Sequence, residues 1–317
     1  MDEISHEEAL KKEFEEQENI APSLGKVRVN DNPSEDPDIK RIKEMTGHIE
    51  LVMENLPSKG RFYRSDMKIL IRPAKVSEIR DFSTMDETNL LDVDDKINKI
   101  LISCTRVSYL SNPGSYKDIL EEDRLYVVLS IKELTFKNGE NKIMMDVPSK
   151  CSQPDCEISD KYEFKTTNLQ YHQEDETISK YYSEENRCYV IETKSSGTFY
   201  MAPPTIGVMR VITDYIKKRE QAKEKWDKAF AQTIPYLVRD WRSFNEHTLK
   251  QKEIEFNGWS SIKYTTVFRL AEMIKVGVKP EFSLTCGKCG QEATFPITFP
   301  GGLKSFFVIS NIADELL

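Results

Sequence analysis

The stretch LPSKGRFYRSDMKILIRP, residues 56–73, opens the folded body of this 317-residue chain and combines a tight turn with a short strand. Pro57 and Gly60 are turn-forming residues, and Gly60 can adopt a positive φ angle because it has no Cβ. The apolar run at 67–72 predicts a strand, which Pro73 ends because proline has no backbone N–H for a sheet. We expect a helix to begin after Pro73.

Two further helices are predicted to follow and to pack together. The first has an Asp-rich first turn, where negative charge suits a helix N-terminus, and its apolar residues recur at helical spacing. These residues are Leu91, Ile97, Ile100, Leu101 and Cys104. The second helix covers 116–136 behind the capping residue Ser115. Its predicted buried side chains are Ile119, Leu120, Leu125, Val128 and Leu129. A small sheet with packed helices predicts the α+β class.

The pattern changes after residue 156. Residues 157–205 alternate apolar and polar side chains as strands do, whereas 206–279 show helical spacing. We interpret 157–279 as a mostly helical insertion into a core α/β domain made of residues 46–156 and 280–317.

Within the helical part, one helix is expected to begin at Ile206 and to run into the charged segment that ends near residue 230. Further helices are predicted near 233–255 and 259–276. The basic residues of 217–228 alternate with acids, which is typical of an exposed helix whose charges pair with each other.

The net charge of −8 is unevenly distributed. Residues 1–45 hold 13 acidic and 7 basic side chains, and this segment also contains three prolines and little apolar sequence. We interpret it as a disordered acidic arm. The remainder is close to neutral, so we do not expect a general nucleic-acid binder. Neither a membrane span nor a secretory signal is recognisable, and we expect a cytosolic product.

Two cysteine pairs suggest a structural metal site. Cys286 and Cys289 have the two-residue spacing of a zinc knuckle, and Cys151 and Cys156 form a looser pair. If the pairs meet, their four thiolates would close a tetrahedral zinc site in a zinc-ribbon-like base, with no open position for catalysis. The alternative is unligated thiols in loops. Cys104 and Cys188 lie in apolar patterns and are interpreted as buried thiols.

The sequence contains no recognisable catalytic motif, so we predict that the protein is not an enzyme. Glu121, Glu122 and Asp123 are interpreted as a solvated helix turn. Asp123 and Arg124 could instead be buried partners of each other, which would still be structural. A metal-dependent hydrolase would require a metal with an open coordination position.

Several of these stretches, in this order, resemble one family. They are the turn at 56–63, the strand ending at Pro73, the helix around 120–126, the pair Cys151 and Cys156, and the pair Cys286 and Cys289 followed by Phe306 and Phe307. The order is similar to that of the baseplate hub assembly proteins of T-even-like contractile-tailed bacteriophages.

This resemblance implies a component or assembly factor of the baseplate hub, located in the host cytoplasm during assembly and in the tail baseplate if retained in the virion. Its partners would be other hub or tail subunits, with the tape-measure protein as a further candidate. The alternative is a zinc-ribbon nucleic-acid-binding or transcription-associated factor.

We expect the interaction surfaces at the 56–63 turn, at the aromatic C-terminal end and at the tryptophans of the insertion, although core packing is the competing interpretation for each aromatic residue. These aromatic residues are Phe295, Phe299, Phe306, Phe307, Trp226, Trp241 and Trp259.

Overall fold

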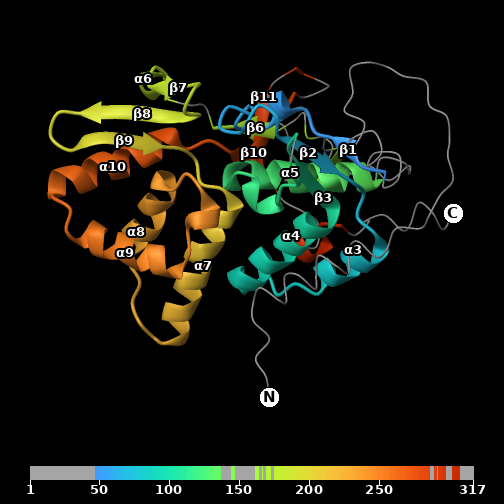
Figure 1. Ribbon diagram of the computed structural model, residues 1–317. Helices are drawn as coiled ribbons and strands as arrows, with labels where there is room; N and C mark the ends of the chain where they lie inside the picture. The colour runs from blue at the N-terminus through green and yellow to red at the C-terminus, as the bar shows by residue number, and fades with distance from the viewer. Residues whose placement is uncertain are drawn as a thin grey trace, which may run out of the picture. The chain divides into compact units, whose positions relative to one another are not determined.

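The computed structural model describes the chain in the following segments: 47–110, 112–136, 144–146, 161–163, 166, 169–172, 175–285, 289–290, 292–297 and 302–307 (Figure 1). Helices and small antiparallel sheets make up these segments, which confirms the α+β class. The predicted arm at 1–45 lies outside the described residues. No helix in the described segments is long and apolar enough to cross a membrane.

The first part of the fold is a three-stranded antiparallel sheet with three helices. The strands, in the order β1-β2-β3, are β1 (Ile49–Glu50), β2 (Lys68–Ile71) and β3 (Thr105–Ser108). The helices are α3 (Val76–Ser83), α4 (Leu90–Cys104) and α5 (Glu121–Phe136), with short 3-10 turns η1 (Met53–Asn55) and η2 (Tyr116–Asp118). The predicted strand and the helix after Pro73 are therefore confirmed.

The helix predicted at 116–136 is divided into two elements. Ser115 caps the 3-10 turn η2, and α5 begins only at Glu121 because Leu120 makes a β-bridge to Thr205. Of the side chains predicted to be buried, Leu125 is 39% exposed and that prediction was wrong, whereas the other four are buried.

Three further sheets are formed by strands that follow α5 in the sequence. One has the order β11-β10-β6, the second pairs β4 with β5, and the third has the order β7-β8-β9. The strands are β4 (Met144–Asp146), β5 (Lys161–Glu163), β6 (Leu169–Tyr171), β7 (Tyr182–Ser183), β8 (Cys188–Thr193), β9 (Gly197–Met201), β10 (Val278–Thr285) and β11 (Glu292–Pro296).

The helices after Pro204 are shorter than predicted. They are α7 (Ile206–Gln221), α8 (Lys228–Thr233), α9 (Glu246–Asn257) and α10 (Ser261–Ile274). The other helical elements of this half are α6 (Glu176–Ser179), η4 (Ile234–Leu237), η5 (Trp241–Ser243) and η6 (Leu303–Ser305). After α7 the backbone turns at Lys223, which has φ 55°, and Asp227 caps a new helix. The helix predicted at 233–255 is likewise interrupted, because η4 and η5 precede the Asn245 cap of α9.

Buried apolar residues form three clusters. The first joins the β1-β2-β3 sheet with α3, α4 and α5, and also contains Leu169, Ile206, Phe306 and Phe307. The second lies between the β7-β8-β9 sheet and α10, which Figure 1 shows alongside β9. The third lies among α7, α8 and α9. Because Leu169 and Ile206 pack in the first cluster, the segment predicted as an insertion also contributes to the core beside the β1-β2-β3 sheet. The predicted domain boundaries themselves remain a prediction.

Candidate functional site

Four consecutive charged residues begin α5: Glu121, Glu122, Asp123 and Arg124. The interpretation of this turn as solvated was wrong, since Asp123 is fully buried and Arg124 is 9% exposed. Neighbouring side chains on a helix point about 100° apart, so each of the four can contact a different part of the fold. The first turn of α5, residues 121–124, is therefore a junction between segments that are distant in the sequence.

Asp123 holds the turn at 56–63. Its carboxylate accepts hydrogen bonds from the Ser58 backbone N–H at 2.9 Å, the Ser58 hydroxyl at 2.6 Å and the Tyr63 hydroxyl at 2.7 Å. The Tyr63 oxygen in turn accepts from the Leu120 backbone N–H at 2.9 Å. Burial raises the pKa of the Asp123 carboxyl, and burial together with the nearby Asp123 raises that of Tyr63. The hydrogen bonds offset the cost of placing this carboxylate inside the protein.

The turn has the backbone geometry that its sequence predicts. Gly60 has φ 74°, and a Cβ added there would lie 3.1 Å from the Met53 Cβ. Leu56, Ser58 and Tyr63 are buried. Much of the turn is therefore packed inside the fold, which is a correction to its prediction as an interaction surface.

Arg124 is bound on another side of α5. Its guanidinium contacts the Asp94 carboxylate at 2.5 Å and the Glu121 carboxylate at 3.0 Å, and it donates to the Asp94 carbonyl oxygen at 3.0 Å. These contacts join α5 to α4. Asp123 and Arg124 are buried, as their interpretation as buried partners requires, but they do not pair with each other, because each binds different residues.

The segment that enters α7 is attached to the same junction. The Glu121 N–H donates to the Pro204 carbonyl oxygen at 2.9 Å, and the Ile206 N–H donates to the Ile119 carbonyl oxygen at 2.7 Å. Nearby, the Trp241 Nε1–H donates to Asp118 at 2.7 Å. A Cβ added to Gly207 would lie 2.5 Å from the Trp241 ring. Trp241 is thus a packing residue of this junction.

The aromatic C-terminal residues also pack inward. Phe306 and Phe307 are each 2% exposed, and their ring centroids lie 5.9 and 5.1 Å from that of Phe82 in α3. The expectation that these two side chains form an interaction surface was wrong. They attach a distant part of the chain to the first cluster instead.

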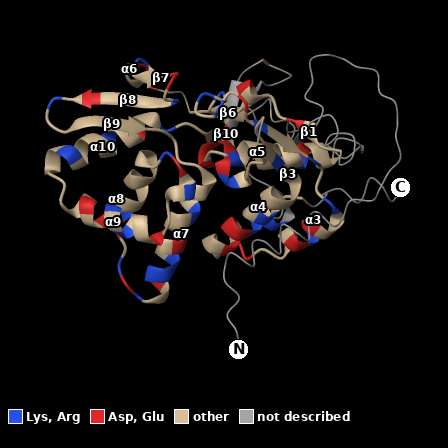
Figure 2. Ribbon diagram, in the orientation of Figure 1, with Lys and Arg blue, Asp and Glu red and all other residues tan. Residues whose placement is uncertain are grey.

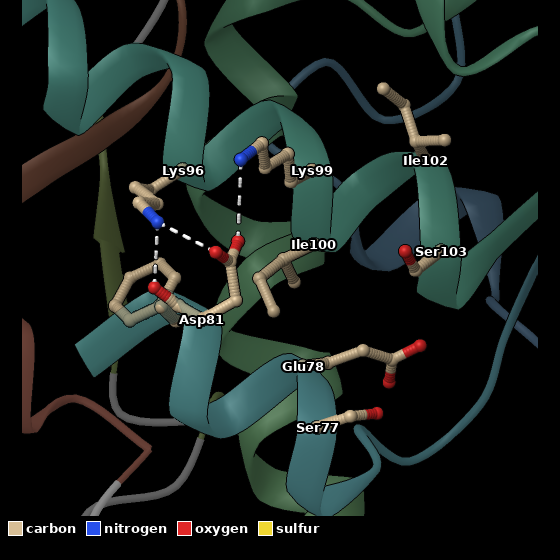
Figure 3. Close-up of a pocket in the computed structure, with 9 residues that line it drawn as sticks. Ser77, Glu78, Asp81, Lys96, Lys99, Ile100, Ile102 and Ser103 are labelled. Carbon is tan, nitrogen blue, oxygen red and sulfur yellow. Dashed lines mark hydrogen bonds and ion pairs between the residues drawn. The ribbon is translucent and has the colours of Figure 1, made fainter. Parts of the chain in front are cut away.

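A cavity of about 250 Å³ lies between α3 and α4 (Figure 3). Its Asp81 carboxylate contacts the Lys96 ammonium at 2.8 Å and the Lys99 ammonium at 3.5 Å. Glu78 points into the same space and pairs with Arg72 at 2.5 Å. These charged groups neutralise one another and hold α3 against α4.

In the basic segment after Ile216, one pair lies within the segment as predicted, Arg219 with Glu224 at 3.0 Å, whereas two others reach α9. Lys218 binds Glu246, and Arg219 contacts Glu253 at 3.2 Å. Figure 2 shows Lys and Arg interspersed with Asp and Glu along α7 and α9. This mixed charge gives no support to the nucleic-acid-binding alternative.

The predicted zinc ligands fall almost wholly outside the described segments. Cys151, Cys156 and Cys286 lie outside them, whereas Cys289 is exposed in the connection between β10 and β11. Among the described residues, no group of three or more His, Cys, Asp or Glu side chains could hold a metal ion. The zinc site and the zinc-ribbon-like base remain predictions. Cys104 and Cys188 are buried, as predicted.

One known protein family matches most of this chain. Residues 48–308 match the family model described as T4 bacteriophage base plate protein. The matched range includes the 56–63 turn and the first turn of α5, and it also spans the segment predicted as an insertion. No curated protein and no solved structure matches the chain. The match covers most of the sequence and confirms the expected relationship to the baseplate proteins of T4-like phages, so the chain belongs to the T4 bacteriophage base plate protein family.

Proposed function

We propose that this baseplate protein is a non-catalytic component or assembly factor of the baseplate hub, and that it acts through protein–protein interfaces. Family membership supports the more general role, a structural protein of the phage tail that works with other tail components. The assignment to the hub follows from the order of sequence stretches that resembles hub assembly proteins. Other hub or tail subunits, including the tape-measure protein, are the proposed partners.

The first turn of α5 is the observation that best supports a structural role. Asp123 and Arg124 bind Ser58, Tyr63 and Asp94, so these buried charges fix the relative positions of protein segments. A subunit that must present surfaces in a fixed geometry benefits from such internal links. Each link uses donors and acceptors whose loss would leave a buried polar group unsatisfied.

Exposed apolar side chains supply candidate anchors for these interfaces. Val76 at the start of α3 is 72% exposed and Leu90 at the start of α4 is 80% exposed. Covering such apolar side chains with a partner removes them from water, which favours association. We therefore propose that the α3–α4 region contacts another tail subunit.

The hub assignment can be tested in phage particles. We would delete the gene, complement it with either the wild-type chain or a Val76→Asp/Leu90→Asp variant, and analyse purified tails by electron microscopy and mass spectrometry. An exposed Ile254→Asp variant in α9 is the matched control.

The proposal predicts tails without complete baseplates in the deletion strain and in the Val76/Leu90 variant, but not in the control. Peptides of the protein in finished tails would identify a component, and their absence there would identify an assembly factor. Normal baseplates in the deletion strain would contradict both roles.

We also propose that Cys151, Cys156, Cys286 and Cys289 bind one structural zinc ion. The support is their spacing and the position of the 286–289 pair between two paired strands. Elemental analysis of the purified chain should give one zinc per molecule, and replacing the four cysteines by serine should abolish it. Cys104→Ser is the control that should retain zinc. A wild-type chain without bound zinc would contradict the proposal.

A further inference from the structure

A cavity of about 410 Å³ lies beside the first turn of α5, on a side that the contacts of Asp123 and Arg124 leave open. Five parts of the chain line it: α5, Pro204 with the start of α7, the segment around α8 and η4, the end of α10 with the start of β10, and the residue after β6. All three apolar clusters therefore border this space. Its polar lining residues are Glu121, Glu122, His172, Gln232, Tyr236, Glu272 and Lys275.

Two carboxylate oxygens in this lining are buried without a hydrogen-bond partner. Glu122 accepts from the Tyr236 hydroxyl at 3.2 Å through Oε1, but its Oε2 has no partner in the structure as described. Glu121 binds Arg124 through Oε1, and its Oε2 is likewise unpartnered. The Glu122 carboxylate accepts from the Tyr236 hydroxyl and from its own backbone N–H, and these contacts leave Oε2 open to a further donor. Buried polar atoms in native proteins are normally satisfied, so this pair of oxygens points to a missing donor.

The charges around the cavity favour a cation once Glu122 is ionised, because Arg124 already neutralises Glu121 and Lys275 balances Glu272. Glu121, Glu122 and Glu272 line it, against the single ammonium of Lys275. Burial and the nearby lysines Lys275 and Lys279 lower the pKa of His172, which favours its neutral form.

The arrangement suits a hydrogen-bonding cation better than a bare metal ion. Within the described part of the chain, no three carboxylate or imidazole groups are placed to share one metal ion. An ammonium group offers three N–H donors in different directions and can reach acceptors that do not converge on one point. Leu125 and Met209 line the same cavity and provide apolar contact for an aliphatic stem.

We propose that this cavity binds a primary alkylammonium group, with Glu122 Oε2 and Glu121 Oε2 as hydrogen-bond acceptors. A lysine side chain of a neighbouring subunit and a free aliphatic amine share this chemistry. The site is separate from the α3–α4 region and does not depend on the hub assignment.

Binding at this site should release a proton. Burial raises the pKa of Glu122 to about 8, with Glu121 and Asp123 contributing on the same helix. The other titratable groups that line the cavity are Tyr236, Glu272, Lys275 and His172. A bound ammonium favours ionised Glu122, so at pH 7 the carboxyl would lose its proton when the cation enters. Affinity should therefore increase as the pH rises from 6 to 8.

Isothermal titration of the full chain can test this with three probes: pentylammonium chloride, the peptide acetyl-Gly-Lys-Gly-amide, and 1-pentanol as a neutral control. We expect saturable binding of an ammonium probe and none of pentanol. Binding of the peptide alone would identify a protein lysine as the ligand, and binding of pentylammonium alone would identify a free amine. Titrations in two buffers of different ionisation enthalpy measure the released proton.

Glu122→Gln should weaken binding about tenfold and abolish the proton release, whereas the surface variant Glu246→Gln should change neither. Circular dichroism would confirm that both variants are folded. If Glu122→Gln does not fold, Glu272→Gln provides the second test, with an expected loss of about threefold. Failure of both ammonium probes to bind the wild-type chain, or binding unchanged in the folded Glu122 or Glu272 variant, would overturn the proposal.

Discussion

The first turn of α5 and the α7–α9 surface, which carries Lys218, Arg219, Glu246 and Glu253, are both dense in charged residues, yet they have opposite roles. In the first, Asp123 is fully buried and its carboxylate accepts three hydrogen bonds from the 56–63 turn. On the second, Lys218 and Glu246 pair at the surface, with side chains 63 and 52% exposed. Similar runs of charge in a sequence thus give a structural junction in one place and a solvated surface in the other.

Burial explains the difference. Water and dissolved ions screen a surface pair, and fixing two long side chains has an entropic cost, so such a pair contributes little. A buried charge has lost its water and depends on the protein groups around it. We therefore expect substitutions in the first turn of α5 to have much larger effects than equivalent substitutions on α7 or α9.

Asp123→Asn should have the largest effect on stability. The amide cannot accept all the hydrogen bonds from Ser58 and Tyr63, and its NH₂ group would face other donors. We expect a loss of about 3–5 kcal/mol in the free energy of unfolding, measured by urea denaturation. Asp95→Asn, an exposed change in α4, is the control and should be nearly neutral. A loss below about 1 kcal/mol in Asp123→Asn, as for an exposed group, would remove the distinction between the two regions.

Arg124→Met should have the next largest effect. It keeps much of the side-chain length but leaves the Asp94 and Glu121 carboxylates without their cation, and we expect a loss of about 3 kcal/mol. The exposed Arg80→Met in α3 serves as the control. A cycle that combines Arg124→Met with Asp94→Asn should give a coupling energy of about 1–2 kcal/mol. Additive effects of the two changes would show that this pair does not link α4 to α5.

The stability of the folded protein should depend on pH through Glu122. Its pKa is about 8 in the folded protein, against an ordinary value of 4.5. Between these values the folded state retains a proton that the unfolded state releases, so stability falls as the pH rises. The slope is at most about 1.4 kcal/mol per pH unit.

The comparison with Glu122→Gln isolates this contribution. Burial lowers the pKa of His48 to about 4, so this residue makes stability rise with pH between pH 4 and 6.5. His48 is present in both proteins, so its contribution cancels in the comparison. The difference between wild-type and variant unfolding free energies should therefore change steadily between pH 5 and 8. A constant difference would contradict the assignment of the raised pKa to Glu122.

Lys218→Ala should have the smallest effect. The side chain lies at the surface and its partner Glu246 also binds Lys250. We expect no change in the unfolding midpoint beyond experimental error, at either low or high salt. A clear, salt-sensitive destabilisation would show that the α7–α9 surface contributes more to the free energy of unfolding than a screened surface pair should.

Local sequence signals predicted the elements that depend on local chemistry. The 56–63 turn, the strand before Pro73 and the helices that pack with the β1-β2-β3 sheet follow from proline, glycine, capping residues and apolar spacing. The helix ends after Pro204 were predicted less well, because Lys223 and the caps Asp227 and Asn245 lie within a sequence of continuous helical character.

The junction at α5 could not be predicted in detail because its contacts are long-range. Ser58 and Asp123 are 65 residues apart, and Arg124 and Asp94 are 30 apart. The position of Asp123 and Arg124 in an apolar helix indicated that they could be buried, but not which residues each of them binds. The burial of Phe306 and Phe307 could not be predicted either. An aromatic residue looks the same in a sequence whether it packs in a core or at an interface.

Amide hydrogen exchange of the wild-type chain and Asp123→Asn, followed by mass spectrometry, tests most directly whether the first turn of α5 is the buried junction of the fold. We predict that the variant loses protection in peptides that cover 56–63 and 119–124, while peptides from α9 and α10 keep the wild-type exchange rates. Equal protection at 56–63 in the two proteins would contradict this account, because the turn would then be held in place without Asp123.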